Sequence, residues 1–141
     1  MQQVHKITEV DLPYTEMKYG PWFDVGGMPD VKEIEMVLNV SKLEMGCADG
    51  SALGVMLERT IDGVIIDDLP FETVNLDAVN CEISKWTQSV VLKKGDTYED
   101  GKPRPMGNKY RFGYFLSQAT LNDPKPIPSI ASFEAAVIVR G

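Results

Sequence analysis

The last third of the chain contains two segments in which apolar and polar side chains alternate, Lys109 to Gln118 and Ile130 to Arg140. Successive side chains of a β-strand point to opposite faces, so this period of two predicts two strands that each bury one face. Two such strands favour a β-sandwich, in which two sheets share one core. The side chains predicted to be buried are Tyr110, Phe112, Tyr114 and Leu116 in the first segment and Phe133, Ala135, Val137 and Val139 in the second.

Short apolar segments separated by turn residues continue this pattern upstream. Val31 to Val40 alternates in the same way and predicts a strand, with a helix as the competing interpretation. Leu53 to Arg59 predicts another strand, and the Asp62-Gly63 pair after it is typical of a tight β-hairpin turn. Further strands are expected at Phe71 to Leu76 and Glu82 to Leu92. We therefore predict an all-β, single-domain antiparallel β-sandwich, jelly-roll-like or Ig-like, with two long irregular loops.

The two irregular loops are Lys93 to Asn108 and Leu121 to Pro128, which contain residues that resist regular pairing. In the second, Pro124, Pro126 and Pro128 alternate, which favours a stiff extended segment with few backbone donors. Such a segment is either a connector that protects a sheet edge or an arm that lies against a neighbouring subunit. Both stretches are candidate functional loops.

Residues 1–22 have no clear assignment, because proline and glycine interrupt them. Their aromatic side chains either close one end of the sandwich or belong to an arm. The organisation we predict is a possible N-terminal arm at 1–22 followed by the sandwich domain at 23–141. Met1 to Pro13 lacks the apolar run of a signal peptide, so no export signal is expected.

The composition is that of an ordinary globular domain, with 43% hydrophobic and 25% charged residues among 141. No stretch approaches the roughly 18 uninterrupted apolar residues of a membrane-spanning helix, so no membrane partner is expected. Fourteen basic against 21 acidic residues give a net charge of -7, which repels phosphate backbones. Nucleic acid is therefore not an expected partner.

The sequence carries little of the equipment that an enzyme needs. His5 is the only histidine and lies in a segment expected to be flexible, which disfavours a Ser-His-acid triad. Asp67-Asp68 and Glu99-Asp100 are adjacent pairs in turn-like sequence, whereas glycosidase carboxylates face each other across a cleft. The two cysteines form no CxxC motif, and no EF-hand or phosphate-binding motif occurs. We expect no enzymatic activity, no cofactor and no required metal ion.

Six segments follow one another in an order that resembles a known pattern. An aromatic-Asp-Val-Gly-Gly motif at Phe23 to Gly27 precedes the strand at Glu33 to Val40, and Val55 to Gly63 then reads Val-Met-Leu-Glu-Arg-Thr-Ile-Asp-Gly. The aromatic-rich Lys109 to Gln118, a proline-containing connector and Ser132 to Gly141 close the chain. In this order the chain resembles small β-sandwich virion proteins of tailed bacteriophages, in the capsid decoration or cement class.

The resemblance implies a non-enzymatic structural protein of the virion, assembled in the host cytoplasm, that stabilises the head through protein contacts. It implies the major capsid protein or another virion protein as partner, and a homo-oligomer, with a trimer favoured. The region from Phe71 to Asn108 is insertion-like and departs from the pattern. Since aromatic, methionine and arginine side chains anchor many interfaces, we look for the contact residues in irregular segments. The predicted interface residues are Tyr14, Tyr19, Trp22, Tyr98, Arg104, Met106, Pro124, Pro126 and Pro128.

The alternative function is a carbohydrate- or receptor-binding β-sandwich module of a phage tail or similar assembly. Trp22 and Trp86, together with several tyrosines, are the residue types of a sugar-stacking platform. A third interpretation is a small enzyme whose carboxylates meet across strands, which would need two acids with shifted pKa values in one cleft.

Overall fold

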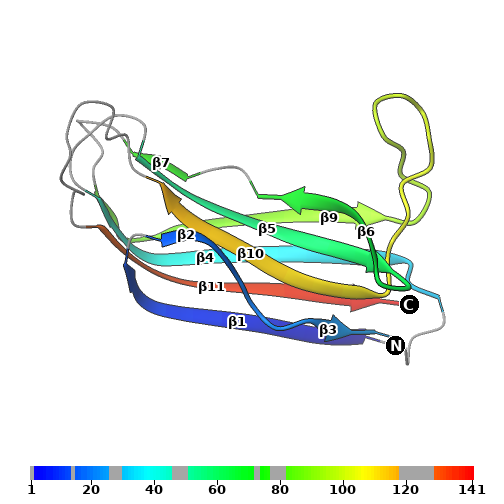
Figure 1. The fold of residues 1–141 in the computed structure, drawn as a ribbon, viewed down its shortest axis with the longest axis horizontal. Helices are drawn as coiled ribbons and strands as arrows, with labels where there is room; N and C mark the ends of the chain where they lie inside the picture. The colour runs from blue at the N-terminus through cyan, green and yellow to red at the C-terminus, as the bar shows by residue number, and fades with distance from the viewer. Residues whose placement is uncertain are drawn as a thin grey trace.

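The computed structural model describes residues 2–13, 15–25, 30–45, 51–71, 74–76, 82–117 and 129–141. This part of the chain contains no helix and folds as an antiparallel sandwich of two sheets (Figure 1). In chain order the strands are β1 (Gln2–Pro13), β2 (Thr15–Tyr19), β3 (Phe23–Asp24), β4 (Glu33–Met45), β5 (Ser51–Ile61), β6 (Val64–Pro70), β7 (Val74–Leu76), β8 (Glu82–Ile83), β9 (Trp86–Lys93), β10 (Lys109–Ser117) and β11 (Ser129–Arg140).

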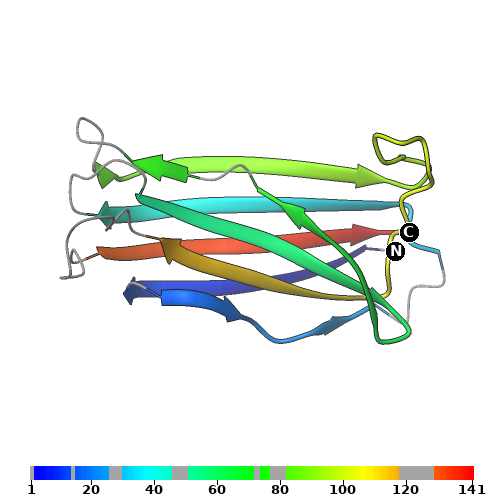
Figure 2. The same cartoon turned by 45° about the horizontal axis from the view of Figure 1, so that its top comes forward.

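The strands divide into two sheets in which every pairing is antiparallel. Sheet A has the order β1-β11-β4, and β8 and β9 both pair with β4 on its other side. Sheet B has β2 and β3 on one side of β10, then β5, and β6 and β7 on the other side of β5. The two views in Figures 1 and 2 show the sheets as layers that lie one over the other.

The pairings form a set of nested hairpins along the chain. The outermost pair is the first strand with the last, β1 with β11. The next pair inward is β2 and β3 with β10, followed by β4 with β8 and β9. The innermost pair is β5 with β6 and β7. Two further pairings, β4 with β11 and β5 with β10, fold this long double ribbon into the two sheets. This connectivity is that of a jelly roll, which decides between the two predicted kinds of sandwich.

The core lies between the sheets and consists of the faces that the alternation predicted. Every side chain predicted to be buried in the last two strands has an exposed fraction of 2% or less. The strand predicted at Val31 to Val40 is confirmed from Glu33 onward as part of β4, and that predicted at Leu53 to Arg59 is confirmed as part of β5. The hairpin turn is also confirmed: Asp62 and Gly63 have φ angles of 50° and 82° between β5 and β6. Removal of these apolar faces from water is the main force that holds the two sheets together.

The structure corrects the interpretation of the N-terminal residues. β1 is an edge strand of sheet A and β2 an edge strand of sheet B, so residues 2–13 and 15–19 belong to the sandwich and form no separate arm. His5 does not lie in a flexible terminus: it pairs with Val137, and its ring stacks on Phe23 with centroids 4.8 Å apart. The inward face of β1 is largely polar, which hides the alternation in the sequence.

Two other predicted segments differ from the structure. The strand expected at Glu82 to Leu92 is interrupted at residues 84–85, between β8 and β9. Of the strand expected at Phe71 to Leu76, only β7 has strand pairing; Phe71 is buried just beyond the end of β6, and residues 72–73 lie outside the described residues. The predicted loop at 121–128 also lies outside them.

Candidate interaction surfaces

The outer face of sheet A carries ion pairs. Nη2 of Arg140 lies 3.0 Å from Oε1 of Glu35, and its Nη1 lies 2.6 Å from Oε2 of Glu33. Hydrogen bonds to these carboxylates, first Glu35 and then Glu33, raise the pKa of Arg140 above its ordinary value. Lys6 and Glu134 form a longer pair, with 3.6 Å between nitrogen and oxygen. Exposed large apolar side chains also lie on strands of this sheet: Val4 and Val10 on β1 and Val91 on β9.

The outer face of sheet B carries aromatic rings over glycine residues. Gly54 pairs with Phe115, and Gly113 pairs with Tyr19. A Cβ atom at Gly54 would lie 2.4 Å from the Phe115 ring, and one at Gly113 would lie 3.0 Å from the Tyr19 ring, so each ring lies directly over its glycine. The exposed large apolar side chains on this face and along the β5–β6 hairpin are Met17, Tyr19, Trp22, Ile61, Val64 and Ile65.

Arg111 organises the centre of this face. Its guanidinium carbon lies 3.9 Å from the centroid of the Tyr19 ring and 4.5 Å from that of the Trp22 ring. Its Nη2 lies 2.7 Å from Oε1 of Glu58, and its Nε donates a hydrogen bond to the same oxygen at 2.9 Å. Because the Glu58 side chain is only 8% exposed, the ion pair is shielded from water and holds the guanidinium against both rings. We call Tyr19, Trp22 and Arg111 the aromatic platform.

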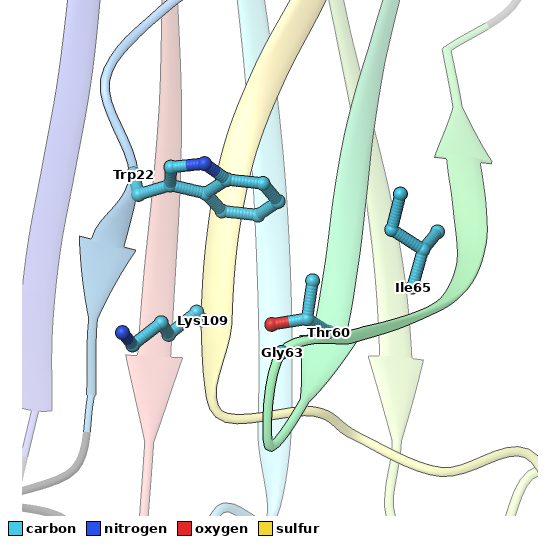
Figure 3. A pocket seen from close by; sticks show the side chains of 5 residues that line it. All are labelled: Trp22, Thr60, Gly63, Ile65 and Lys109. Carbon is cyan, nitrogen blue, oxygen red and sulfur yellow. The ribbon is translucent and has the colours of Figure 1, made fainter.

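A pocket lies beside the aromatic platform, near the turn between β5 and β6 (Figure 3). Its volume is about 290 Å³, and its lining residues are Trp22, Thr60, Gly63, Ile65 and Lys109. Figure 3 shows the indole of Trp22 on one side and Ile65 on the other, with the hydroxyl of Thr60 directed toward Lys109. Thr60 is 3% exposed, and within the described part of the chain its hydroxyl has no hydrogen-bond partner.

The connection between β9 and β10, predicted to be irregular, is a small ordered hairpin. Thr97 and Pro103 form an antiparallel bridge, and the amide of Tyr98 donates a hydrogen bond to the carbonyl of Lys102 at 2.9 Å. The guanidinium carbon of Arg104 lies 5.2 Å from the centroid of the Tyr98 ring. Figure 1 shows this connection extending beyond the sheets at the end where both chain termini lie. We call residues 94–108 the projecting loop.

Two buried side chains anchor the base of the projecting loop. Arg59 on β5 is fully buried, and its Nη1 donates to the carbonyl oxygens of Pro105 and, at 3.4 Å, Met106. The hydroxyl of Tyr110 lies 3.0 Å and 3.1 Å from the carbonyl oxygens of Met106 and Gly107. Burial raises the pKa of Tyr110 to about 12, because the phenolate would lose its hydration. The loop is therefore held at its base, whereas its outer half is exposed.

The structure gathers the described residues of the predicted interface into two clusters. Tyr19 and Trp22 belong to the aromatic platform, and Tyr98 and Arg104 stack in the projecting loop. Met106 lies at the base of that loop and packs against the core, away from its exposed half. The other predicted residues, Tyr14, Pro124, Pro126 and Pro128, lie outside the described residues.

Arg111, Lys109 and Thr60 were not among the residues that the sequence singled out. The alternation in Lys109 to Gln118 does place Lys109 and Arg111 on the outer face of a strand, so part of the signal is present. Their neighbours come from β2 and β5, which are far away in the sequence. No local pattern contains the register between such strands, so the sequence does not reveal the cluster.

Some chemistries are not represented among the residues that the structure describes. These residues include no group of three or more histidine, cysteine or acidic side chains placed to hold a metal ion. They also include no helix that is long and apolar enough to cross a membrane. His5, which stacks on Phe23, has its Nε2 3.4 Å from Oε1 of Gln3.

Solved structures similar to this fold come from virus particles. The match to a structure of infectious bursal disease virus strain Gx has a TM-score of 0.62 at 13% identity, and that to strain Gt has 0.64 at 12%. A crystal structure of the T13 particle of the same virus matches with 0.64 at 13%. Each match covers 99% of this chain but only 32%, 33% and 31% of the other chain, so this chain spans about a third of their length. The sequence matches no established protein family and no curated protein.

Proposed function

We propose that this chain is a non-enzymatic structural protein of a virus particle, in the capsid decoration or cement class. The observation that carries the proposal is the match of 99% of the chain to one region of chains in infectious bursal disease virus particles. The jelly roll is a recurrent architecture of viral capsid domains, which supports the same role. The order of sequence segments that resembles phage virion proteins is a second, independent support. A protein of this kind acts through the area of its contacts.

We assign the particle contact to the outer half of the projecting loop. Tyr98 and Arg104 stack there, and tyrosine and arginine are enriched among the residues that dominate interface energies. Arg59 and Tyr110 hold the base of the loop, so that docking costs little conformational entropy. The partner in this proposal is the major capsid protein or another virion protein, and the site of assembly is the host cytoplasm.

The proposed oligomer is a homo-oligomer, with a trimer favoured. β1 is 12 residues long and is the last strand of sheet A in the described structure, so its outer edge offers backbone groups to a second copy. Val4 and Val10 on this strand are 54% and 72% exposed, and they supply apolar area at the same edge. Repetition of one such contact around a closed ring is the usual way to build a symmetric oligomer.

Two measurements test the proposal. Light scattering on the purified chain is expected to give the mass of a trimer. Shells assembled from the capsid protein of the virus that encodes this chain are expected to bind it saturably in cosedimentation. Tyr98→Ala and Arg104→Ala should each weaken that binding roughly tenfold, as loss of an interface anchor does. Lys85→Gln, an exposed change between β8 and β9 and outside the loop, is the control. A chain that does not sediment with the shells contradicts the proposal.

A further inference from the structure

We infer that the pocket beside the aromatic platform receives the proline-containing segment 121–128 of a second copy of this chain, with the side chain of Ile127 inside the pocket. The inference deepens the proposed homo-oligomer and rests on that part of the proposed function. Three observations carry it: the pocket is apolar, the exposed rings beside it suit a proline-containing segment, and the segment of the same copy is too short to reach it.

The pocket is apolar where a ligand can reach it. The indole of Trp22 and the side chain of Ile65 lie on opposite sides of it (Figure 3). The hydroxyl of Thr60 is buried. The ammonium group of Lys109 points away from the pocket toward β3, where Asp24 is its cross-strand neighbour. The pocket therefore suits an aliphatic side chain, whose burial is favourable without a polar partner.

Tyr19 and Trp22 form a second apolar surface next to the pocket. Their ring centroids lie 3.9 Å and 4.5 Å from the guanidinium carbon of Arg111, so the two rings are close together. They nevertheless remain 44% and 42% exposed. Grooves lined by aromatic rings bind proline-rich segments in several classes of recognition domain. Because proline restricts the backbone before binding, such a segment loses little conformational entropy when it docks.

The segment 121–128 has a pattern of residues that matches this surface. Its sequence is Leu-Asn-Asp-Pro-Lys-Pro-Ile-Pro, with prolines at 124, 126 and 128. In a polyproline II helix, residues three apart lie on one face and are about 9 Å apart along the axis. Pro124 and Ile127 would share such a face on docking, and Lys125 and Pro128 another. The first face can place proline on the rings and isoleucine in the pocket.

The segment of one copy cannot fill the pocket of the same copy. Ile127 comes two residues before Ser129, the first residue of β11, so it lies within about 7 Å of that residue. β10 ends and β11 begins at the same end of the sandwich (Figures 1 and 2). Lys109, which lines the pocket, is at the other end of β10, roughly 27 Å along the strand. An isoleucine from this segment must therefore come from another copy.

The charges near the pocket allow two copies to meet there. The chain carries a net charge of -7, so two copies repel each other overall. At the platform Arg111 is paired with Glu58, and Lys109 lies opposite Asp24, while the segment contains one aspartate and one lysine. Both partners in the contact are thus close to neutral. A contact between two different surfaces repeats head to tail and closes into a ring, as the proposed trimer requires.

Cysteine cross-linking tests which copy supplies the segment. In a chain whose two native cysteines are replaced by serine, Ile65→Cys is combined with Ile127→Cys, and mild oxidation is expected to join separate copies covalently. Val91→Cys combined with Ile127→Cys is the matched control. Val91 is 44% exposed and Ile65 57% exposed, but Val91 lies on β9 in sheet A, far from the platform. The control pair should give several-fold less covalent oligomer.

A peptide with the sequence of residues 121–130 tests whether the side chains are recognised. It is titrated into full-length chain carrying Ile127→Ser, whose own segment should compete little. In ¹⁵N spectra the indole signal of Trp22 is expected to shift saturably, while that of Trp86 on β9 stays in place. Ile127→Ser in the peptide should weaken binding roughly tenfold or more, because the aliphatic burial is lost. Lys125→Gln in the peptide is the control and should bind as the parent peptide does.

Four results would overturn the inference. These are equal cross-linking of the test and control pairs, a disulfide formed within one chain, an unchanged Trp22 signal, and equal binding of the parent and Ile127→Ser peptides. Cosedimentation with shells separates this inference from the proposed function. A chain that cross-links selectively but does not bind shells supports the inference and contradicts the proposed function. Saturable binding to shells with equal cross-linking of the two pairs does the reverse.

Discussion

Glu58 and Arg111 form an ion pair of 2.7 Å on the outer face of sheet B, and the acidic side chain is only 8% exposed. The two residues lie directly opposite each other in the register of β5 and β10. Because the guanidinium also contacts the rings of Tyr19 and Trp22, one carboxylate on β5 positions two aromatic side chains from another part of the chain. The aromatic platform therefore depends on the pairing of distant strands.

Glu58→Gln is expected to lower the free energy of unfolding by about 1–3 kcal/mol, because a shielded charge-assisted hydrogen bond is replaced by a neutral one. Urea denaturation followed by tryptophan fluorescence measures this change. The control is Glu134→Gln, which breaks the exposed pair with Lys6, where the side chains are 42% and 62% exposed. That change should cost about 0.5 kcal/mol or less. Equal costs for the two substitutions would mean that the Glu58 pair is no stronger than a surface pair.

Gly54→Ala tests the close approach of Phe115 to the sheet. The ring lies 2.4 Å from the position of the new Cβ, so the substitution is expected to cost about 1–3 kcal/mol of unfolding free energy. In a Phe115→Ala background the obstacle is absent, and the same substitution should then cost nothing measurable. The double-mutant cycle isolates the contact between the two residues. An undiminished cost in the second background would assign the effect to the backbone of β5.

The sequence predicts the structure best where the alternation of apolar and polar residues within one strand is enough to show which side chains are buried. The buried faces of β10 and β11 follow directly from alternation, since Tyr110, Phe112 and Val137 point inward whatever strands lie beside them. The turn at Asp62-Gly63 is equally local, because its positive φ angles suit these residue types. Strand prediction and hairpin prediction succeed for the same reason.

Features that depend on partners far along the chain are not predictable in this way. The sequence pattern does not identify β1 as a strand, because its inward face includes the polar residues His5 and Glu9. Its pairing with β11 in the structure does identify it. The pocket combines Trp22, Thr60 and Lys109 from three separate segments, and their meeting depends on the register of sheet B. If the strands of sheet B paired one residue out of this register, the same side chains would point toward the core.

Two buried tyrosines predict a loss of stability at alkaline pH. Burial raises the pKa of Tyr110 to about 12, and burial followed by the hydrogen bond to Glu9 raises that of Tyr114. In the unfolded chain both ionise near pH ~10, so their contribution to stability is fully present below that pH. It is lost as the pH rises from there through the folded pKa values.

Urea denaturation at a series of pH values, extending about 2 units to either side of the ordinary tyrosine pKa, checks this prediction. Ultraviolet absorbance of the phenolate counts the ionised tyrosines in the same samples. Of the five tyrosines, Tyr110 and Tyr114 should ionise only as the chain unfolds. Tyr110→Phe and Tyr114→Phe should each flatten the pH dependence, while Tyr19→Phe, at a side chain that is 44% exposed, serves as control. Unchanged slopes in both buried variants would assign the alkaline transition to other groups.

The hydrogen bonds of Arg59 predict that the order of the projecting loop depends on a side chain in the core. Its fully buried Nη1 donates to carbonyl oxygens at residues 105 and 106, so Arg59→Met leaves these acceptors without their donor and is expected to cost about 2–4 kcal/mol. Hydrogen exchange should accelerate at the Asn108 amide, which donates to the carbonyl of Thr60 at 2.8 Å. Arg104→Met, in the same loop, should leave that amide protected. If both variants exchange alike, the loop is held by its own hairpin and not by the arginine beneath it.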